Sequence, residues 1–145
     1  MPVSASSSPS TPGAALRPAG DGYVPGTCNI GQWEVRRRWA GGIAGLAIAA
    51  ALLVALIAVH APPIARVLVL LPAWGGAFSV LQARRRFCGG YAMRGISNFG
   101  DTHATIRSVP DEAAHRADIA AMRRMLRDAF AIAAVITAVA VLLPV

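Results

Sequence analysis

The sequence predicts an all-α membrane protein with three transmembrane helices, because three long stretches are apolar and carry no charge. The 145 residues are 55% hydrophobic and only 14% charged, whereas an ordinary soluble domain has about 25% charged residues. The spans expected from these stretches are about 39–59, 66–83 and 128–145, and roughly 17–25 helical residues cross a bilayer core. Since backbone groups in lipid must be bonded within their own segment, each span is expected to be a helix.

The arginines predict the orientation of these spans. All 14 basic residues are arginines, and 13 of them lie before the first span or between the second and third spans. Only Arg66 lies in the turn between the first two spans. Basic residues concentrate on the cytoplasmic side of membrane proteins, so we expect a cytoplasmic N-terminus and a cytoplasmic segment 84–127. The predicted location is the bacterial cytoplasmic (inner) membrane, as a multi-pass protein with Val145 on the far side.

The first 27 residues differ in composition from the rest of the chain. They are rich in Ser, Pro, Gly and Ala, with almost no charge, and such low-complexity segments lack the apolar residues that build a core. The chain therefore divides into a low-complexity tail, residues 1–27, and a three-helix transmembrane domain, residues 28–145. The tail is expected to be disordered unless a partner surface orders it.

Two helix starts carry the sequence pattern of a capping box. Asn29 with Gln32 three residues later predicts the start of the first helix. Ser108 with Asp111 predicts the start of the third helix in the same way. In this pattern the first side chain bonds a free N–H of the first helical turn.

Proline and glycine predict how the helices are connected. Two consecutive prolines in the segment 60–63 predict a tight turn that makes the first two spans an antiparallel hairpin. Pro72 is expected to kink the second helix. Four glycines in residues 84–100 favour a structured loop. A long third helix is expected to follow, with a cytoplasmic half up to about Asp128 and a membrane half after it.

The spans lack the side chains that transport or catalysis would need. Within the uncharged runs 39–59, 67–83 and 129–145, the only polar side chains apart from the tryptophans are Ser79, Gln82 and Thr137. Pumps, ion-coupled transporters and channels place ionisable or polar groups along a path. No P-loop, zinc-protease, nucleophile-elbow or dinucleotide motif occurs in the sequence. We therefore expect no enzymatic activity and no cofactor of its own. Contact with a pigment, quinone or lipid of a host complex is left open.

Cys28 and Cys88 both fall beside the membrane on the predicted cytoplasmic side. Together with His103 or His115 they are weak candidates for a metal site, because no spacing typical of zinc ligands supports coordination. A thiol pair active in sulfur or redox chemistry is a second interpretation. The favoured interpretation is that both cysteines are packing residues, so no metal site is predicted.

Two arginine triplets, each at one end of a span, predict contact with lipid. Basic clusters near a membrane surface attract anionic headgroups by ~1 kcal/mol per residue, and interfacial tryptophans flank the first triplet. Anionic lipids are thus the expected partners, with an acidic protein face as the alternative, and nucleic acid is disfavoured. The residues assigned to lipid or partner binding are Arg36, Arg37, Arg38, Arg84, Arg85, Arg86, Trp33 and Trp39.

Small residues recur along one face of the first span. Gly41 and Gly45 form a GxxxG pattern that Ala49 continues, and small residues at this spacing let helix backbones approach closely. These three residues are the predicted helix-packing site. The partner helix is expected to come from the same chain, with another subunit as the alternative.

Two stretches carry a resemblance to a family. CNIG at residues 28–31, with Glu34 and the arginines that follow, resembles the entry to a group of small bacterial multi-span membrane proteins of unknown function. FCGGY at 87–91 and the RGI and NFG groups within 94–100 resemble the segment after their second helix. More distantly, the hairpin is similar to the two-helix inner-membrane domain fused to some rhodanese sulfurtransferases. This chain departs from those fusions, since it has no rhodanese domain and adds a third span. The resemblance implies no catalytic residues.

Taken together, these features favour a non-catalytic role in a larger assembly. We expect an accessory or assembly subunit of a bacterial membrane complex of respiratory or photosynthetic type, held to other membrane-protein subunits by helix packing and cytoplasmic contacts. The alternative is a membrane thiol protein in sulfur or redox traffic that uses Cys28 and Cys88. A solute exporter is disfavoured, because the spans supply no polar lumen.

Overall fold

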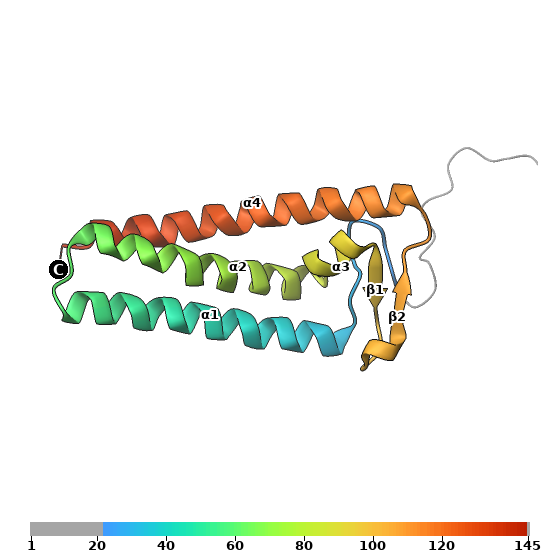
Figure 1. The fold of residues 1–145 in the computed structure, drawn as a ribbon, viewed down its shortest axis with the longest axis horizontal. Helices are drawn as coiled ribbons and strands as arrows, with labels where there is room; N and C mark the ends of the chain where they lie inside the picture. Colours follow the sequence, from blue (N-terminus) through green and yellow to red (C-terminus); the bar gives the residue numbers. More distant parts are fainter. Residues whose placement is uncertain (1–21, 145) are drawn as a thin grey trace, which may run out of the picture.

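The computed structural model describes residues 22–144, and three long helices dominate it (Figure 1). The helices lie side by side, with α2 between α1 and α4. Their bounds are α1 Gln32–Ala58, α2 Leu70–Arg85 and α4 Glu112–Leu142, and a 3₁₀ helix, η1 Pro63–Val69, leads directly into α2. Residues 1–21 of the predicted tail (1–27) and the position of Val145 lie outside the described residues.

Three helical stretches of the described chain are long and apolar enough to cross a membrane. They are Gln32–Ala58, the combined η1 and α2 stretch Pro63–Arg85, and Glu112–Leu142. The prediction of three spans, made from the uncharged runs, is confirmed at this level. The third helix is also continuous as predicted, because no Pro or Gly interrupts residues 112–142.

Most of the remaining described residues form a head region at one end of the long helices. We define the head region as residues 22–31 and 86–111 (Figure 1). It contains the short helix α3 Gly89–Arg94, the strands β1 Ile96–Asn98 and β2 Ile106–Ser108, and the 3₁₀ turn η2 His103–Thr105. The two strands pair antiparallel, with Ser97 opposite Arg107. The chain is therefore mostly but not entirely helical, and the expectation of an all-α fold missed this small β-hairpin.

Glycines bring α1 and α2 into close contact. A Cβ atom at Gly45 would lie 2.9 Å from the backbone nitrogen of Gly76, and one at Gly42 would lie 2.6 Å from a methyl carbon of Val80. Such distances leave no room for a side chain, so the two backbones approach as in a small-residue helix interface. Of the predicted packing residues, Gly45 faces Gly76, Gly41 lies opposite the Ser79 hydroxyl and Ala49 is buried. Gly42, which the predicted pattern omitted, packs as closely as Gly45.

Alanines line the contact between α2 and α4. Ala129 and Ala133 on α4 are fully buried, as is Ala73 on α2. Trp74 and Phe130 add an edge-to-face ring contact with centroids 6.3 Å apart, the geometry that aromatic pairs prefer. Small buried residues therefore let α4 lie close to α2 along the bilayer-length part of both helices.

A buried arginine joins the hairpin turn to the end of α4. Arg66, in η1, is only 2% exposed, and its guanidinium donates hydrogen bonds to the Ala140 and Leu143 carbonyls at 3.1 and 2.9 Å. Carbonyls at a helix C-terminus lack intrahelical donors and favour a nearby cation. Arg66, which the sequence placed in the turn between the first two spans, thus caps a neighbouring helix. Pro72, where a kink was predicted, lies in the first turn of α2. The helix changes from 3₁₀ to α at residue 70, so the irregular part of this span is η1, which comes before the proline.

Both predicted capping boxes were wrong in detail. The first helix begins after Gly31 without a side-chain cap, because the Asn29 side chain bonds residue 88 instead. The third helix is capped by Asp111, whose carboxylate accepts the Ala114 N–H at 2.8 Å. Asp111 therefore acts as the capping residue itself, and Ser108 belongs to β2.

Candidate functional site

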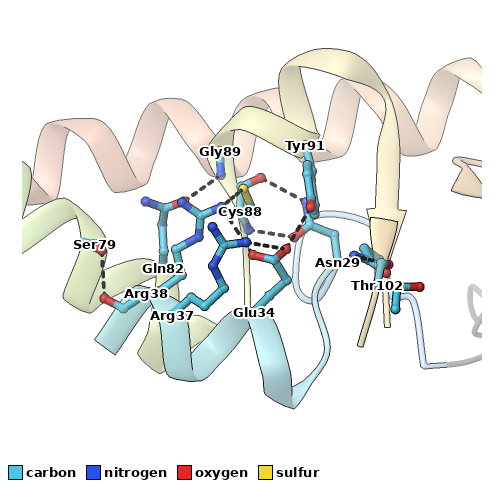
Figure 2. A network of polar contacts seen from close by, with 11 residues as sticks. Asn29, Glu34, Arg37, Arg38, Ser79, Gln82, Cys88, Gly89, Tyr91 and Thr102 are labelled. Atoms are coloured by element: carbon cyan, nitrogen blue, oxygen red, sulfur yellow. Dashed lines mark hydrogen bonds and ion pairs between the residues drawn. The ribbon is translucent and has the colours of Figure 1, made fainter. Parts of the chain in front are cut away.

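A network of buried polar groups joins the head region to the start of α1 (Figure 2). Its centre is Asn29, which is fully buried. The Asn29 side chain accepts the Cys88 N–H at 2.6 Å and donates to the Cys88 carbonyl at 3.1 Å. The Asn29 and Ile30 N–H groups both donate to the Arg86 carbonyl. Asn29 therefore pairs with the 86–88 segment much as a neighbouring strand would.

The same segment of chain is paired on its other side by β1. The Gly31 N–H donates to the Asn98 carbonyl at 2.8 Å, and the Asn98 N–H donates to the Asn29 carbonyl at 3.0 Å. The Asn98 side chain accepts the Thr105 hydroxyl at 2.6 Å and closes the loop before β2. Residues 29–31 thus lie between two backbone partners, which fixes where α1 begins.

Glu34 is the acidic member of the network, in the first turn of α1. Its carboxylate is 2% exposed and accepts the Tyr91 hydroxyl at 2.9 Å. Two guanidinium groups lie near it, Arg37 at 3.8 Å and Arg38 at 3.6 Å. Burial and the hydrogen bond to Glu34 raise the pKa of the Tyr91 phenol above its ordinary value. The tyrosine therefore stays a proton donor to the carboxylate.

Cys88 contacts a cation, whereas Cys28 contacts none among residues 22–144. The Cys88 sulfur is 3.0 Å from a terminal nitrogen of Arg38, and the residue is 2% exposed. Cys28 is half-buried, with its sulfur 3.9 Å from the Ile30 carbonyl. Both thiols are free. The structure thus places both cysteines in the head region and gives them different surroundings.

The two histidines named as weak metal candidates contact different parts of the chain. His103 packs edge-on against Trp33, with ring centroids 6.3 Å apart. His115, on α4, lies against Gly95 of the head region. Within residues 22–144, no three His, Cys, Asp or Glu side chains gather in a way that could hold a metal ion. The candidate metal set is therefore not brought together in this part of the chain.

Some of the predicted lipid-binding residues are exposed, and others contact side chains of the same chain. Arg36 and Trp39 are exposed, and Arg37 lies over the Trp33 ring at 4.8 Å. In the second triplet, Arg84 is exposed and Arg85 forms an ion pair with Asp128 at 2.7 Å. Arg86 ends α2 in a left-handed conformation with φ of 50°. All of these residues lie at the head end of α1 or α2.

A second buried polar cluster attaches residues 22–27 to α4. The Asp118 carboxylate is fully buried and accepts the Tyr23 hydroxyl at 2.9 Å and the Gly26 N–H at 2.6 Å. Burial and this carboxylate raise the pKa of Tyr23 well above its ordinary value. Residues 22–27, which the sequence assigned to the tail, thus pack against the head end of α4.

Sequence reasoning did not single out Asn29, Tyr91, Tyr23 or Asp118 as site residues. For Asp118 a signal was present, because it shares one helix face with Ala114, Ala121 and Met125, all of them buried. A carboxylate on a buried apolar helix face needs a hydrogen-bond partner, so the sequence could have indicated that Asp118 accepts a hydrogen bond from another segment. For Asn29, the local capping pattern pointed to the wrong partner.

Compared with protein-family models, curated proteins and solved structures, the chain has no significant match. The resemblance drawn from the CNIG and FCGGY stretches therefore stays a prediction. The fold itself defines the class: a mostly helical chain with three helices long and apolar enough to span a membrane, which fits a multi-pass membrane protein.

Proposed function

We propose that this chain is a non-catalytic accessory or assembly subunit of a larger membrane complex of respiratory or photosynthetic type. In this proposal it is a multi-pass protein of a bacterial cytoplasmic membrane, with its N-terminus and head region in the cytoplasm. The excess of arginine at the head end supports this orientation.

The exposed surface of α1 carries the proposal. Only 11% of the most apolar 18-residue window of α1 is buried within the chain. Large apolar side chains point away from α2, including Ile43, Ile48 and Val54, which are 62%, 60% and 65% exposed. Because the narrow glycine face satisfies the contact with α2, the rest of α1 is free to face lipid or another subunit.

The head region supports a structural role over a catalytic one. Its buried polar side chains are hydrogen-bonded mainly to backbone groups and to each other, as in the pairing of Asn29 with residue 88 and of Glu34 with Tyr91. Such networks fix a unique arrangement of segments. A fixed head region beside the membrane can serve as a docking platform for a partner subunit.

Extraction in mild detergent tests this proposal. The tagged chain would be extracted from its native membrane and run on a native gel, with an absorption spectrum of the band and identification of the co-migrating chains. A band well above the 15.0 kDa chain, with fixed partners, is expected. A monomer or a small homo-oligomer would overturn the proposal.

A pair of tryptophan substitutions locates the contact. Ile48→Trp adds bulk to the exposed face of α1, and Val135→Trp adds the same bulk on α4, where the side chain is 65% exposed. Lipid accommodates either change, whereas a packed subunit interface does not. We expect Ile48→Trp to release the chain from the large band at an unchanged membrane level, and Val135→Trp to leave it there.

One contact favours the alternative, a thiol protein in sulfur or redox traffic. The Arg38 guanidinium lies 3.0 Å from the Cys88 sulfur, and reactive cysteines are found beside such cations. This alternative predicts that Cys88 reacts with iodoacetamide faster than Cys28, and that Arg38→Gln but not Arg36→Gln slows it. Replacing both cysteines with serine separates the two proposals, because a subunit would still assemble normally.

A further inference from the structure

A hollow opens between α1 and α2 at the head end, close to the polar network of Figure 2. It has a volume of about 150 Å³. Four of its five lining residues are polar or charged, and they come from both helices: Glu34, Arg37, Arg38, Gly41 and Ser79. The hollow thus combines two guanidinium groups with one carboxylate.

The charges that line the hollow favour an anion. Arg37 and Arg38 share the single carboxylate of Glu34, at 3.8 and 3.6 Å. Glu34 also accepts the Tyr91 hydroxyl, so its oxygens are largely occupied. One positive charge is left over in a partly enclosed space, where electrostatic attraction is stronger than in water.

Arg38 also has an unused donor. Its Nε–H is buried and has no hydrogen-bond partner among the described residues, whereas a terminal nitrogen of the same guanidinium contacts Cys88. Buried donors in folded proteins are nearly always satisfied. An acceptor from outside the chain would complete this guanidinium, and phosphate oxygens match guanidinium geometry well.

The position of the hollow along α1 indicates where such an acceptor would come from. Arg38 is the last charged residue before the uncharged run of α1, and the exposed Trp39 follows it directly. Arginine followed by tryptophan at this point is typical of the headgroup level of a bilayer. Gly41 lies one turn deeper, and a Cβ atom there would come within 3.2 Å of the Ser79 hydroxyl, so glycine keeps the space between the helices open.

We propose that this hollow binds the phosphodiester group of an anionic glycerophospholipid. Arg37 and Arg38 would bond the phosphate oxygens, and the acyl chains would lie along the exposed apolar side chains of α1. An anionic headgroup is preferred over a choline headgroup, because a choline cation would meet the surplus positive charge. The site is independent of any partner subunit, so its test uses the purified full chain.

Native mass spectrometry of the full chain in detergent tests the site, with dioleoyl phosphatidylglycerol and dioleoyl phosphatidylcholine as probes. We expect one phosphatidylglycerol to stay bound per chain, at least about tenfold tighter than phosphatidylcholine. Arg37→Gln should weaken phosphatidylglycerol binding by about tenfold or more, the scale of one lost charged hydrogen bond. Arg37 is 57% exposed, so its substitution leaves the buried network in place.

Arg36→Gln is the matched control, because Arg36 is the exposed neighbour of Arg37 on the same helix and does not line the hollow. The control should bind phosphatidylglycerol like the unmodified chain. Equal weakening by both substitutions would show general surface attraction and overturn the site, as would equal retention by all three chains. A thermal-unfolding measurement on the same purified chain compares inorganic phosphate with phosphatidylglycerol. If phosphate alone raises the melting temperature as much as phosphatidylglycerol does, the site takes soluble phosphate and the lipid assignment is wrong.

Discussion

Replacing Asp118 with alanine should release residues 22–27 from α4. The Asp118 carboxylate is fully buried and holds the Tyr23 hydroxyl and the Gly26 N–H. After the change the buried Tyr23 hydroxyl and the partly buried Gly26 N–H would both lack this partner, at a cost of about 1–3 kcal/mol each. Alanine itself is favourable in a helix, so the cost falls on the docked segment, which should lose about 2–6 kcal/mol relative to an undocked one.

Hydrogen–deuterium exchange measured by mass spectrometry checks this magnitude. Exchange of the peptide covering residues 22–31 reports the docking of the segment, because the Gly26 N–H bonds the Asp118 carboxylate only when the segment is in place. The lower bound of about 2 kcal/mol corresponds to exchange roughly 30-fold faster. Amides in the apolar half of α4, such as those of residues 129–139, should keep their protection.

Asp128→Ala supplies the matched control for this measurement. Asp128 lies on the same helix and pairs with Arg85 at 2.7 Å, but the two side chains are 37% and 45% exposed. An exposed ion pair contributes only about 0–1 kcal/mol, so the control should leave exchange of residues 22–31 unchanged. If Asp118→Ala exchanges at the unmodified rate, or if Asp128→Ala accelerates exchange equally, the assignment of Asp118 as the anchor is wrong.

Three further predictions concern pH, the far end of the helices and their glycine contact. The raised pKa of Tyr23 means that the docked state holds the phenol proton more tightly than the unfolded state does. The stability that the Tyr23 hydroxyl contributes is therefore complete below the ordinary tyrosine pKa of about 10 and falls as the pH rises above that value. Tyr23→Phe should remove this loss of stability, measured by thermal unfolding between about pH 8 and pH 11. Arg66→Met should lower the free energy of unfolding in detergent by about 2–4 kcal/mol, because the last carbonyls of α4 lose two bonds from a charged donor. Gly76→Ala should cost about 1–3 kcal/mol by overpacking, since its Cβ atom would meet backbone of α1 at 2.8 Å, whereas Gly75→Ala, which meets nothing within 4 Å, should be neutral or slightly stabilising.

The long helices could be predicted from sequence because hydropathy and helix breakers act locally. An uncharged run of about 20 residues is sufficient to indicate a span, and no knowledge of the neighbouring helix is needed. The same holds for α4, whose 31 residues contain neither Pro nor Gly. Local composition also indicated that the glycine-rich segment after α2 is structured but not one long helix.

The face that α1 presents to α2 was only partly predictable. The GxxxG pattern selected Gly41 and Gly45, whereas the closest approaches of α1 to α2 are those of Gly42 to Val80 and of Gly45 to Gly76. Which residues of α2 lie opposite depends on the rotation of that helix about its axis. Seven residues of 3₁₀ helix precede α2, and their tighter winding changes this rotation in a way that no periodicity in the sequence indicated.

The head region was least predictable, because its order rests on contacts between distant residues. Asn29 carries a local signal for a helix cap, but its side chain pairs with Cys88, 59 residues away. Tyr23 and Asp118 are separated by 95 residues. A short-range pattern of the kind that predicts caps competes here with long-range hydrogen bonds to a segment whose position depends on the whole hairpin.

The way the head region is held together has a consequence for its role. Its buried contacts include Asn29, Glu34 and Asp118, each of which is at most 2% exposed and satisfied by named partners. A polar group of this kind contributes little when satisfied and costs much when it is left unpaired. Such contacts add little to the free energy of unfolding, but they strongly disfavour other arrangements of the segments, in which these groups would be buried without a partner. Under the proposed role as an assembly subunit, a head region that presents one fixed shape to a partner would need this specificity, in addition to the apolar contact that the exposed face of α1 would supply.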